Sequence, residues 1–410
     1  MSLDVTQVRK EIPILSREVH GRRIVYLDSA ASSLPPQRVI DAMSNYYETT
    51  HANVHRGVYA TAEEATRLFE QARIGVGRFV GSTDPLHEVV FTKNTTEAIN
   101  LVAHGWARHH LNEGDAVVLT IMEHHANIVP WQMLAAERGI ELRFLPLDEH
   151  LRLDCSKLEE TLAGAKLLSV TAMSNVLGTI PPLADLARAA HAAGALIHVD
   201  AAQAIAHLEL DMAALDLDLL SFSGHKALGP TGVGALVARA EVLESMSPFL
   251  GGGGMILDVS VDRFLPAEPP ARFEPGTPPI AEAIGLNAAL GYLTELGRAE
   301  IRAHELDLTT KAMTRLSDHF GDRLKIWGPP AGADRGGVLS LELEGVHAHD
   351  TAQMLDSVGV CVRPGHHCAK PLMKALGLVA TARASFGVYN DLDDVEALIE
   401  GLEQAAKLFA

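Results

Sequence analysis

A chain of 410 residues, 47% of them hydrophobic, can bury the core of a large domain and of a smaller one, which excludes an intrinsically disordered protein. Its formal net charge of −18 opposes binding to nucleic-acid phosphates, because no dense block of lysine and arginine offsets it. No apolar run approaches the roughly 20 residues that span a bilayer, and the N-terminus lacks a signal-peptide pattern, so we expect a soluble, cytoplasmic protein with neither a membrane nor a nucleic-acid partner.

Helical patterns alternate with short apolar runs from about residue 60 to residue 240. A capping-box spacing at 61–64 begins a helix that is expected to end near Val80. The strands predicted after it, rich in Val, Ile and Leu, are 89–91, 116–120, 167–171, 196–200, 217–221 and 234–238. Helices are expected near 128–138 and 183–193. This alternation is typical of an α/β fold whose mainly parallel sheet is covered on both faces.

The second half of the chain has a different organisation. Residues 265–279 contain six prolines, which exclude a regular helix or central strand and predict an extended excursion in contact with another subunit. A helical region from about 280 to 320, strands at 338–343 and 358–362, and a terminal helix from about 392 follow. We therefore predict a large domain over 25–285 and a smaller α+β domain formed by 1–24 and 286–410.

Two charged side chains follow predicted strands. Lys226 comes just after the strand at 217–221, at the carboxyl end where open α/β sheets bind their ligands. Taken alone, such a lysine is more often a solvated surface residue. Asp200 ends the strand at 196–200, and a carboxylate there either caps a loop or needs a partner that offsets the cost of its burial. A pyridoxal-phosphate (PLP) enzyme uses both groups, a lysine as Schiff base and an acid on the pyridine nitrogen.

Hydroxyl groups near other strand ends predict a phosphate site. Thr95 and Thr96 follow the strand at 89–91 and open an apolar helix, where hydroxyls and free backbone N–H groups suit an anion. As a lone motif this is weak, because threonine is ordinary at a helix start. Ser223 and His225 are candidate further donors to the phosphate, and Gln203 is a candidate donor to the cofactor's phenolic oxygen.

A pair of histidines, His124 and His125, follows the strand at 116–120. An imidazole there can lie flat on a pyridine ring and exchange protons near its ordinary pKa of roughly 6.5. Paired histidines also suggest a metal, but adjacent residues do not share a face and no nearby cysteine or carboxylate completes a zinc set, so no metal is expected. Asn175, beyond the strand at 167–171, is another polar group at a strand end.

These pieces, in this order, resemble the fold-type I PLP-dependent transferases of the class V aminotransferase superfamily. Within that superfamily, the sequence most resembles SufS-type, group II cysteine desulfurases and selenocysteine lyases. It is carried by NVHRG at 53–57, EHHANIVPW at 123–131, SNVLG at 174–178 and RPGHHCA at 363–369. It extends from residue 26 to residue 390, nearly the whole chain. Lys93, Ala201, Leu228, Pro364 and Lys370 depart from the pattern, and none of them removes a chemical group that the reaction needs.

The resemblance implies a role for each candidate residue. The cofactor would be held by Lys226, Asp200, Gln203 and His124, with its phosphate bound by Thr95, Thr96, Ser223 and His225 and by Thr277 from a partner subunit of a homodimer. Arg383 would grip the substrate carboxylate through two parallel hydrogen bonds, which a lysine could not reproduce. Asn175 and Arg363 would support that grip, and His55 and Arg56 would line the entrance.

The three cysteines, Cys155, Cys361 and Cys368, are too few for a disulfide framework, and their odd number leaves at least one free thiol. Cys361 lies in an apolar run, where a thiol behaves as a small buried hydrophobe. Cys155 shows no activating partner. Cys368 lies close in sequence to Arg363 and Lys370, and positive neighbours favour the nucleophilic thiolate.

Cys368 is thus the expected sulfur acceptor in a desulfurase that converts L-cysteine to L-alanine. The resemblance further implies that its persulfide is passed to an acceptor protein of the SufE or SufU kind, for iron–sulfur cluster assembly. Three alternatives remain: a selenocysteine lyase acting on L-selenocysteine, a class V aminotransferase that needs no active thiol, and a catalytically inactive scaffold.

Overall fold

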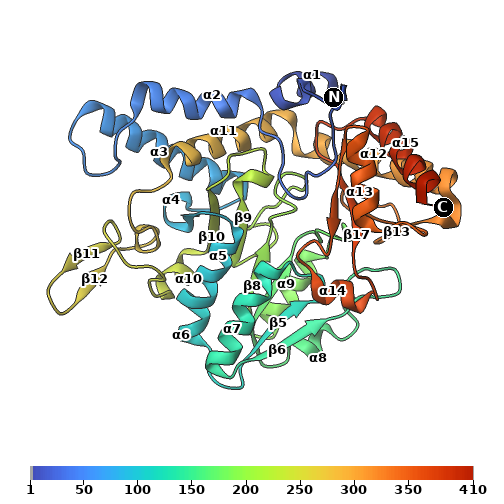
Figure 1. Cartoon of the computed structure of the whole chain (residues 1–410). Coiled ribbons are helices and arrows are strands. Elements are labelled where there is room, and N and C mark those ends of the chain that lie inside the picture. The colour runs from blue at the N-terminus through green and yellow to red at the C-terminus, as the bar shows by residue number, and fades with distance from the viewer. Residues whose placement is uncertain (1–2, 410) are drawn as a thin grey trace.

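The computed structural model describes residues 3–409 and is built around a seven-stranded sheet and a four-stranded sheet (Figure 1). The large sheet has the order β4-β10-β9-β8-β7-β5-β6. Its strands are β4 (Val89–Thr92), β5 (Ala116–Thr120), β6 (Glu141–Leu145), β7 (Ala165–Thr171), β8 (Leu196–Asp200), β9 (Leu219–Ser223) and β10 (Gly234–Ala238). Neighbouring strands from β6 to β9 are parallel, whereas β10 is antiparallel to both β9 and β4. The predicted α/β class with a mainly parallel sheet is confirmed.

Helices cover both faces of the large sheet because successive strand residues point to opposite sides. Val118 packs into one hydrophobic core with residues of α3 (Ala60–Phe79), α9 (Leu183–Ala192) and α11 (Ile280–Leu296). Its neighbours Val117 and Leu119 pack into a second core. The second core is shared with α5 (Thr95–Leu101), α7 (Val129–Arg138) and α10 (Ala240–Ser245). Of the other helices in this part of the chain, α2 (Gln37–Asn45) packs against α11, and α4 (Pro85–Glu88), α6 (Arg108–His110) and α8 (Leu158–Leu162) precede β4, β5 and β7.

The small sheet is fully antiparallel, with the order β13-β14-β17-β16. Its strands are β13 (Leu324–Trp327), β14 (Val338–Leu343), β16 (Arg363–Gly365) and β17 (Thr381–Ser385). Apolar residues of α12 (Arg298–Phe320), α13 (Ala348–Ser357) and α15 (Leu392–Phe409) share a hydrophobic core with this sheet. Helix α14 (Lys370–Ala375) follows β16 after a short loop, which brings Cys368 between the two sheets.

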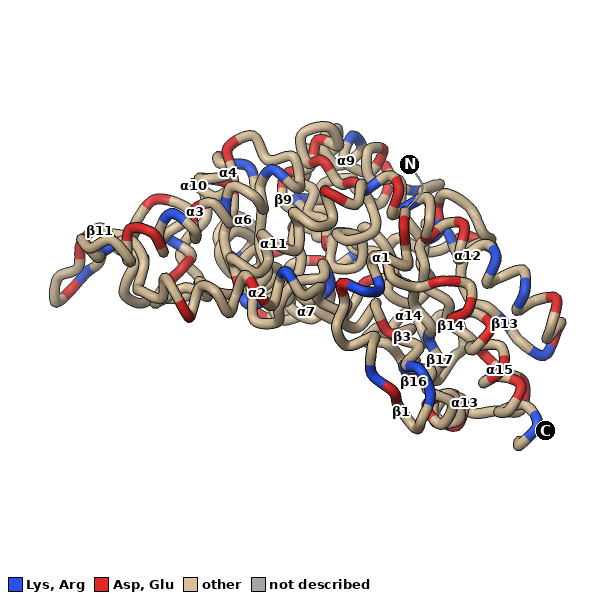
Figure 2. Tube along the Cα trace, turned by 90° about the horizontal axis from the view of Figure 1, so that it is seen from above, with Lys and Arg blue, Asp and Glu red and all other residues tan. Residues whose placement is uncertain are grey.

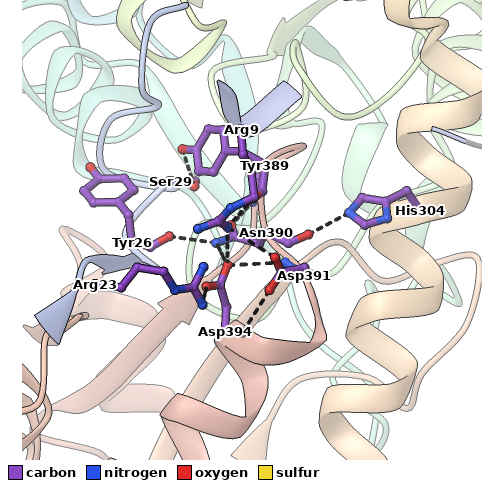
Figure 3. A network of polar contacts seen from close by, with 10 residues as sticks. Arg9, Arg23, Tyr26, Ser29, His304, Tyr389, Asn390, Asp391 and Asp394 are labelled. Atoms are coloured by element: carbon purple, nitrogen blue, oxygen red, sulfur yellow. Dashed lines mark hydrogen bonds and ion pairs between the residues drawn. The ribbon is translucent and has the colours of Figure 1, made fainter. Parts of the chain in front are cut away.

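The N-terminal segment is attached to the last residues of the chain (Figure 3). After α1 (Val5–Lys10) and two short strands, β1 (Glu18–Val19) and β2 (Arg22–Arg23), β3 (Val25–Tyr26) pairs in parallel with β15 (Val360–Cys361). Arg9 and Arg23 bind opposite oxygens of the buried Asp394, at 3.0 and 2.8 Å. Asn390 donates to Asp394 at 2.8 Å and to the carbonyl oxygen of Tyr26 at 3.0 Å. Residues from both ends of the chain therefore fold together.

Most predicted elements lie where the sequence placed them, with three exceptions. The strand expected at 217–221 is β9, two residues later, because the N–H of Leu217 is taken by the carbonyl of Met212 in a turn. The helical region at 280–320 is divided at Gly297, whose φ of 86° ends α11 before α12 begins. The strand expected at 358–362 is reduced to the two residues of β15.

The proline-rich excursion is irregular over most of its length, as predicted. Its first residues belong to β12 (Phe264–Pro266), which pairs with β11 (Ile256–Val259) in a hairpin that projects from the body of the molecule (Figure 1). Figure 2 shows this hairpin at one extremity and the C-terminus at the other, with basic positions dispersed among acidic ones. Among residues 3–409, no helix has the length and apolarity needed to cross a membrane.

Candidate active site

A cavity of about 550 Å³ opens at the carboxyl ends of the parallel strands, where the Cys368 loop meets the large sheet. Most of the residues predicted for the site line it. They are Thr95, Thr96, His124, Asn175, Asp200, Gln203, Ser223, His225, Lys226, Arg363, Cys368 and Arg383. They come from the ends of five strands of the large sheet, from β16 and β17 of the small sheet and from the loop between β16 and α14, so the fold, not proximity in sequence, brings them together.

Lys226 lies in a single 3₁₀ turn, Gly224–Lys226, directly after β9. Withdrawal of its amine from water lowers the pKa to about 8, although the nearby carboxylate of Asp200 acts in the opposite direction. A substantial fraction of the amine is therefore neutral near pH 8 and able to act as a nucleophile or a base.

Asp200 is buried at the end of β8 and accepts a hydrogen bond from the N–H of Ala202 at 2.9 Å. Burial raises the pKa of this carboxyl, opposed by that N–H and by Lys226. A buried carboxylate with so few donors is stabilised by a cationic partner in the cavity. Gln203 is also buried and donates to the carbonyl of Ala30 at 2.7 Å, which leaves its second amide hydrogen for another acceptor.

A cluster of hydroxyls lies where the phosphate site was predicted. The N–H and the hydroxyl of Thr95 are 2.8 and 2.7 Å from Oγ of Ser223. Thr96, the next residue of α5, is exposed on the cavity wall. Burial lowers the pKa of His225 to about 4, with Lys226 acting in the same direction, so this ring is neutral at physiological pH.

His124 enters the cavity from the end of β5. Its Nδ1 accepts the N–H of Ala126 at 3.0 Å, so the neutral ring carries its proton on Nε2. Burial lowers its pKa to about 3, with Lys226 next in effect. The preceding Glu123 is fully buried, and its Oε1 accepts the N–H of Thr171, the strand partner of Asp200, at 3.0 Å. This carboxyl fixes the turn that presents His124.

Arg383 provides a cation inside the cavity. The side chain is buried on β17, and its Nη1 donates to the carbonyl of Asn175 at 3.0 Å. Its Nη2 lies 3.2 Å from Asp28, whose other oxygen is 3.3 Å from Nε of the more exposed Arg363. The buried Nε of Arg383 has no hydrogen-bond partner in the structure. Because a buried guanidinium N–H is costly to leave unpaired, this atom is suited to receive a carboxylate.

Cys368 is exposed on the loop between β16 and α14. Its φ is 54° and that of His367 is 51°, a left-handed backbone that non-glycine residues adopt at a cost. The carbonyl of His367 accepts a bond of 2.6 Å from Asn175. Burial raises the pKa of the other two thiols, Cys155 and Cys361, which disfavours their nucleophilic form.

Three predicted residues do not line this cavity. His55 pairs with Glu70 at 2.8 Å, and Arg56 is exposed beside it. Thr277 lines a separate hollow with Phe91 and residues of the proline-rich segment. Their predicted roles at the entrance and in a partner's phosphate site stay predictions. Among residues 3–409, no cluster of three or more potential metal ligands occurs.

Sequence reasoning gave no role to Asp28, which binds two arginines of the cavity, or to the lining residues Ala30, His349 and His366. Asp28 follows the apolar run that contains β3, the same strand-then-acid pattern that identified Asp200. That pattern could have identified Asp28. His349, at the start of α13, carries no such signal.

Together the cavity offers an amine with a lowered pKa, a buried carboxylate and a cluster of hydroxyls. These groups fit an aromatic aldehyde that carries a basic ring nitrogen and a phosphate, which is the chemistry of PLP. The unpaired guanidinium N–H of Arg383 fits the carboxylate of an amino-acid substrate.

The family model described as aminotransferase class-V matches residues 25–398. A probable cysteine desulfurase of Streptomyces coelicolor is 46% identical over 99% of this chain and 98% of its own length. A cysteine desulfurase of Serratia proteamaculans is 45% identical over all of both chains. Among solved structures, the apo cysteine desulfurase of Thermococcus onnurineus superposes with a TM-score of 0.93 at 42% identity, over 99% of each chain. The cysteine desulfurase CsdA of Escherichia coli gives 0.90 at 37% identity over the full length of both chains.

Proposed function

Since this chain belongs to the class V aminotransferase family and is a PLP-dependent, fold-type I enzyme of the cysteine desulfurase type, we propose that it moves sulfur from L-cysteine to Cys368 and releases L-alanine. The single observation that carries the proposal is the cavity itself. It combines a lysine, an unpaired guanidinium N–H and an accessible thiol.

The proposed roles follow from the geometry. Lys226, Asp200, Gln203 and His124 hold the cofactor, and the hydroxyl cluster with His225 binds its phosphate. When bound, PLP withdraws electrons from the substrate and so weakens its bonds at the α- and β-carbons. The amine of Lys226, with its lowered pKa, takes the α-proton of the substrate. Arg383 orients the substrate through its carboxylate.

The sulfur step balances without any further reactant. The Cβ–S bond of cysteine breaks, an S–S bond forms to Sγ of Cys368, and a proton completes the methyl group of alanine. The outer sulfur of the resulting persulfide then leaves for a second protein. We propose an acceptor of the SufE or SufU kind, in the service of iron–sulfur cluster assembly in the cytoplasm. The exposure of Cys368 at the cavity mouth supports this transfer.

A second copy of the chain completes the proposed enzyme. The β11–β12 hairpin exposes the apolar side chains of Leu257, Val259, Val261, Phe264 and Leu265. Such a patch on a projecting hairpin is typical of a surface that another chain covers. His55, Arg56 and Thr277, which lie outside their own chain's cavity, would then reach the partner's site. Sedimentation at the mass of one chain would contradict this homodimer.

The proposed reaction is tested by incubating the purified protein with L-cysteine and a thiol reductant. Alanine and sulfide are expected in equal amounts, because each persulfide that is reduced releases one sulfide. Neither product would appear if the assignment were wrong. Measuring L-selenocysteine in parallel separates a desulfurase from a selenocysteine lyase.

Replacing Arg383 with lysine is expected to raise KM for cysteine roughly 10- to 100-fold, because charge-assisted hydrogen bonds contribute about 1.5–3 kcal/mol. An ammonium group cannot reproduce the planar guanidinium grip. Steady-state kinetics of alanine formation provide the measurement, and Arg188→Lys, on the exposed face of α9, is the control. An unchanged KM would show that another residue binds the substrate carboxylate, and Arg363 would be the next candidate.

Asp200→Ala is expected to weaken cofactor retention by roughly 10- to 100-fold, since it removes a charged partner worth about 1.5–3 kcal/mol. It is also expected to slow removal of the α-proton, because the ring loses the charge that strengthens its electron withdrawal. Visible absorbance after dialysis measures retention, and exchange of the α-hydrogen of L-alanine in deuterated water measures proton removal. Unchanged values for both would exclude the proposed pairing.

A further inference from the structure

His125, the second histidine after β5, contacts the loop that carries Cys368 at two points. Its backbone N–H donates to the carbonyl of Cys368 at 2.7 Å. Its ring Nε2 lies 3.0 Å from the backbone N of Lys370 and accepts that N–H. The two bonds hold the backbone directly after the Cys368 side chain, and they join a turn of the large sheet to a loop of the small one.

The loop needs outside support for two reasons. The positive φ values of His367 and Cys368 disfavour its conformation. Helix α14 begins at Lys370 without a side-chain cap, because its N-cap residue is Ala369. The first N–H groups of a helix have no partner within the helix, and the ring of His125 supplies one for Lys370 from a distant part of the chain.

The ring can accept this bond only in its neutral form, since a backbone N–H always donates. Its surroundings favour that form. Burial lowers the pKa of His125, and the nearby His366 and Lys370 lower it further. The ring of His366 lies 5.7 Å from that of His125, and that of His124 lies 6.3 Å away.

We propose that His125 is a positioning residue for sulfur transfer, which fixes the thiol of Cys368 through the backbone that directly follows it. This inference rests on the proposed function, because it assigns His125 to the step in which Cys368 receives sulfur. The inference also assigns different roles to the two histidines of the pair. His124 faces the cofactor site, whereas His125 holds the nucleophile loop. The earlier step, removal of the α-proton by Lys226, does not depend on His125.

The test compares the holoenzyme with His125→Ala and His125→Gln. A glutamine side-chain oxygen can accept the Lys370 N–H in place of Nε2, whereas alanine cannot. His109→Ala, an exposed histidine on α6, is the control. In His125→Ala, kcat for alanine formation from cysteine is expected to fall roughly 100-fold, as for a misplaced reacting group. KM for cysteine and the α-hydrogen exchange of L-alanine are expected to stay unchanged.

Hydrogen exchange gives a readout that does not depend on activity. The amide of Lys370 is expected to exchange faster in His125→Ala than in the wild type, and His125→Gln is expected to restore both its protection and most of kcat. Unchanged kcat and unchanged exchange in His125→Ala would overturn the inference, as would failure of glutamine to restore protection. A wild type that makes no alanine from cysteine would instead overturn the proposed function, while the exchange of Lys370 would still test the contact with His125.

Discussion

Lys226→Ala is expected to lose activity by at least about three orders of magnitude, because positioned proton transfer alone contributes roughly 10²- to 10⁴-fold. The variant also loses the amine proposed to attach the cofactor, and no other lysine among residues 3–409 lines the cavity. Visible absorbance of the dialysed protein is therefore expected to disappear together with alanine formation. The α-hydrogen exchange of L-alanine is expected to stop as well.

Lys407→Ala is the matched control, since this exposed lysine of α15 lies outside the cavity. It is expected to behave as the wild type in all three measurements. If the Lys226→Ala variant kept its visible absorbance after dialysis, the cofactor would have to be attached to another lysine.

Cys368→Ala is expected to keep the cofactor spectrum and to change it on addition of cysteine, yet to lose nearly all desulfuration. The cofactor groups require no thiol, whereas cleavage of the C–S bond requires a thiolate to receive the sulfur. Activity on selenocysteine is expected to survive to a much larger extent, because a selenol is more acidic and leaves more readily. Alanine formation from each amino acid measures the difference.

The same assignment predicts where the sulfur is found. Mass spectrometry of the wild type after brief exposure to cysteine is expected to detect one added sulfur on the peptide that contains Cys368. Cys155→Ala and Cys361→Ala, which remove the two less exposed thiols, are expected to retain activity. Sulfur on either of those residues, or a fully active Cys368→Ala, would refute the nucleophile assigned here.

The central part of the site could be predicted because each group lies at the end of an apolar strand or within four residues after it. Lys226, Asp200, Thr95 and His124 all have this position, and strand ends of a parallel sheet meet at one edge. The apolar runs of β5, β7 and β8 were distinct enough to define those ends to the residue.

The remaining parts depend on contacts between distant segments, which no local pattern encodes. Strand β17 was not predicted, because Thr381–Ser385 consists of small residues around one arginine. Its burial comes from pairing with β14 and β16. Asp28 and Arg383 are 355 residues apart in the sequence, and the small sheet brings them into contact. The proposed positions of His55, Arg56 and Thr277 at a partner's site would depend on a second chain.

The attachment of the N-terminal segment to the end of the chain determines when the enzyme can mature. Asp28, which binds both arginines of the cavity, follows β3, and β3 pairs only with β15 near residue 360. Arg9 and Arg23 find their common partner at Asp394, sixteen residues before the C-terminus. During synthesis the large sheet can form while the ribosome is still translating, because chains fold from the N-terminal side as they emerge. The contact between Asp28 and Arg383 cannot form until β17 has been synthesised. A chain that ends before β16 therefore lacks both the Cys368 loop and Arg383, so it cannot carry out the proposed sulfur transfer.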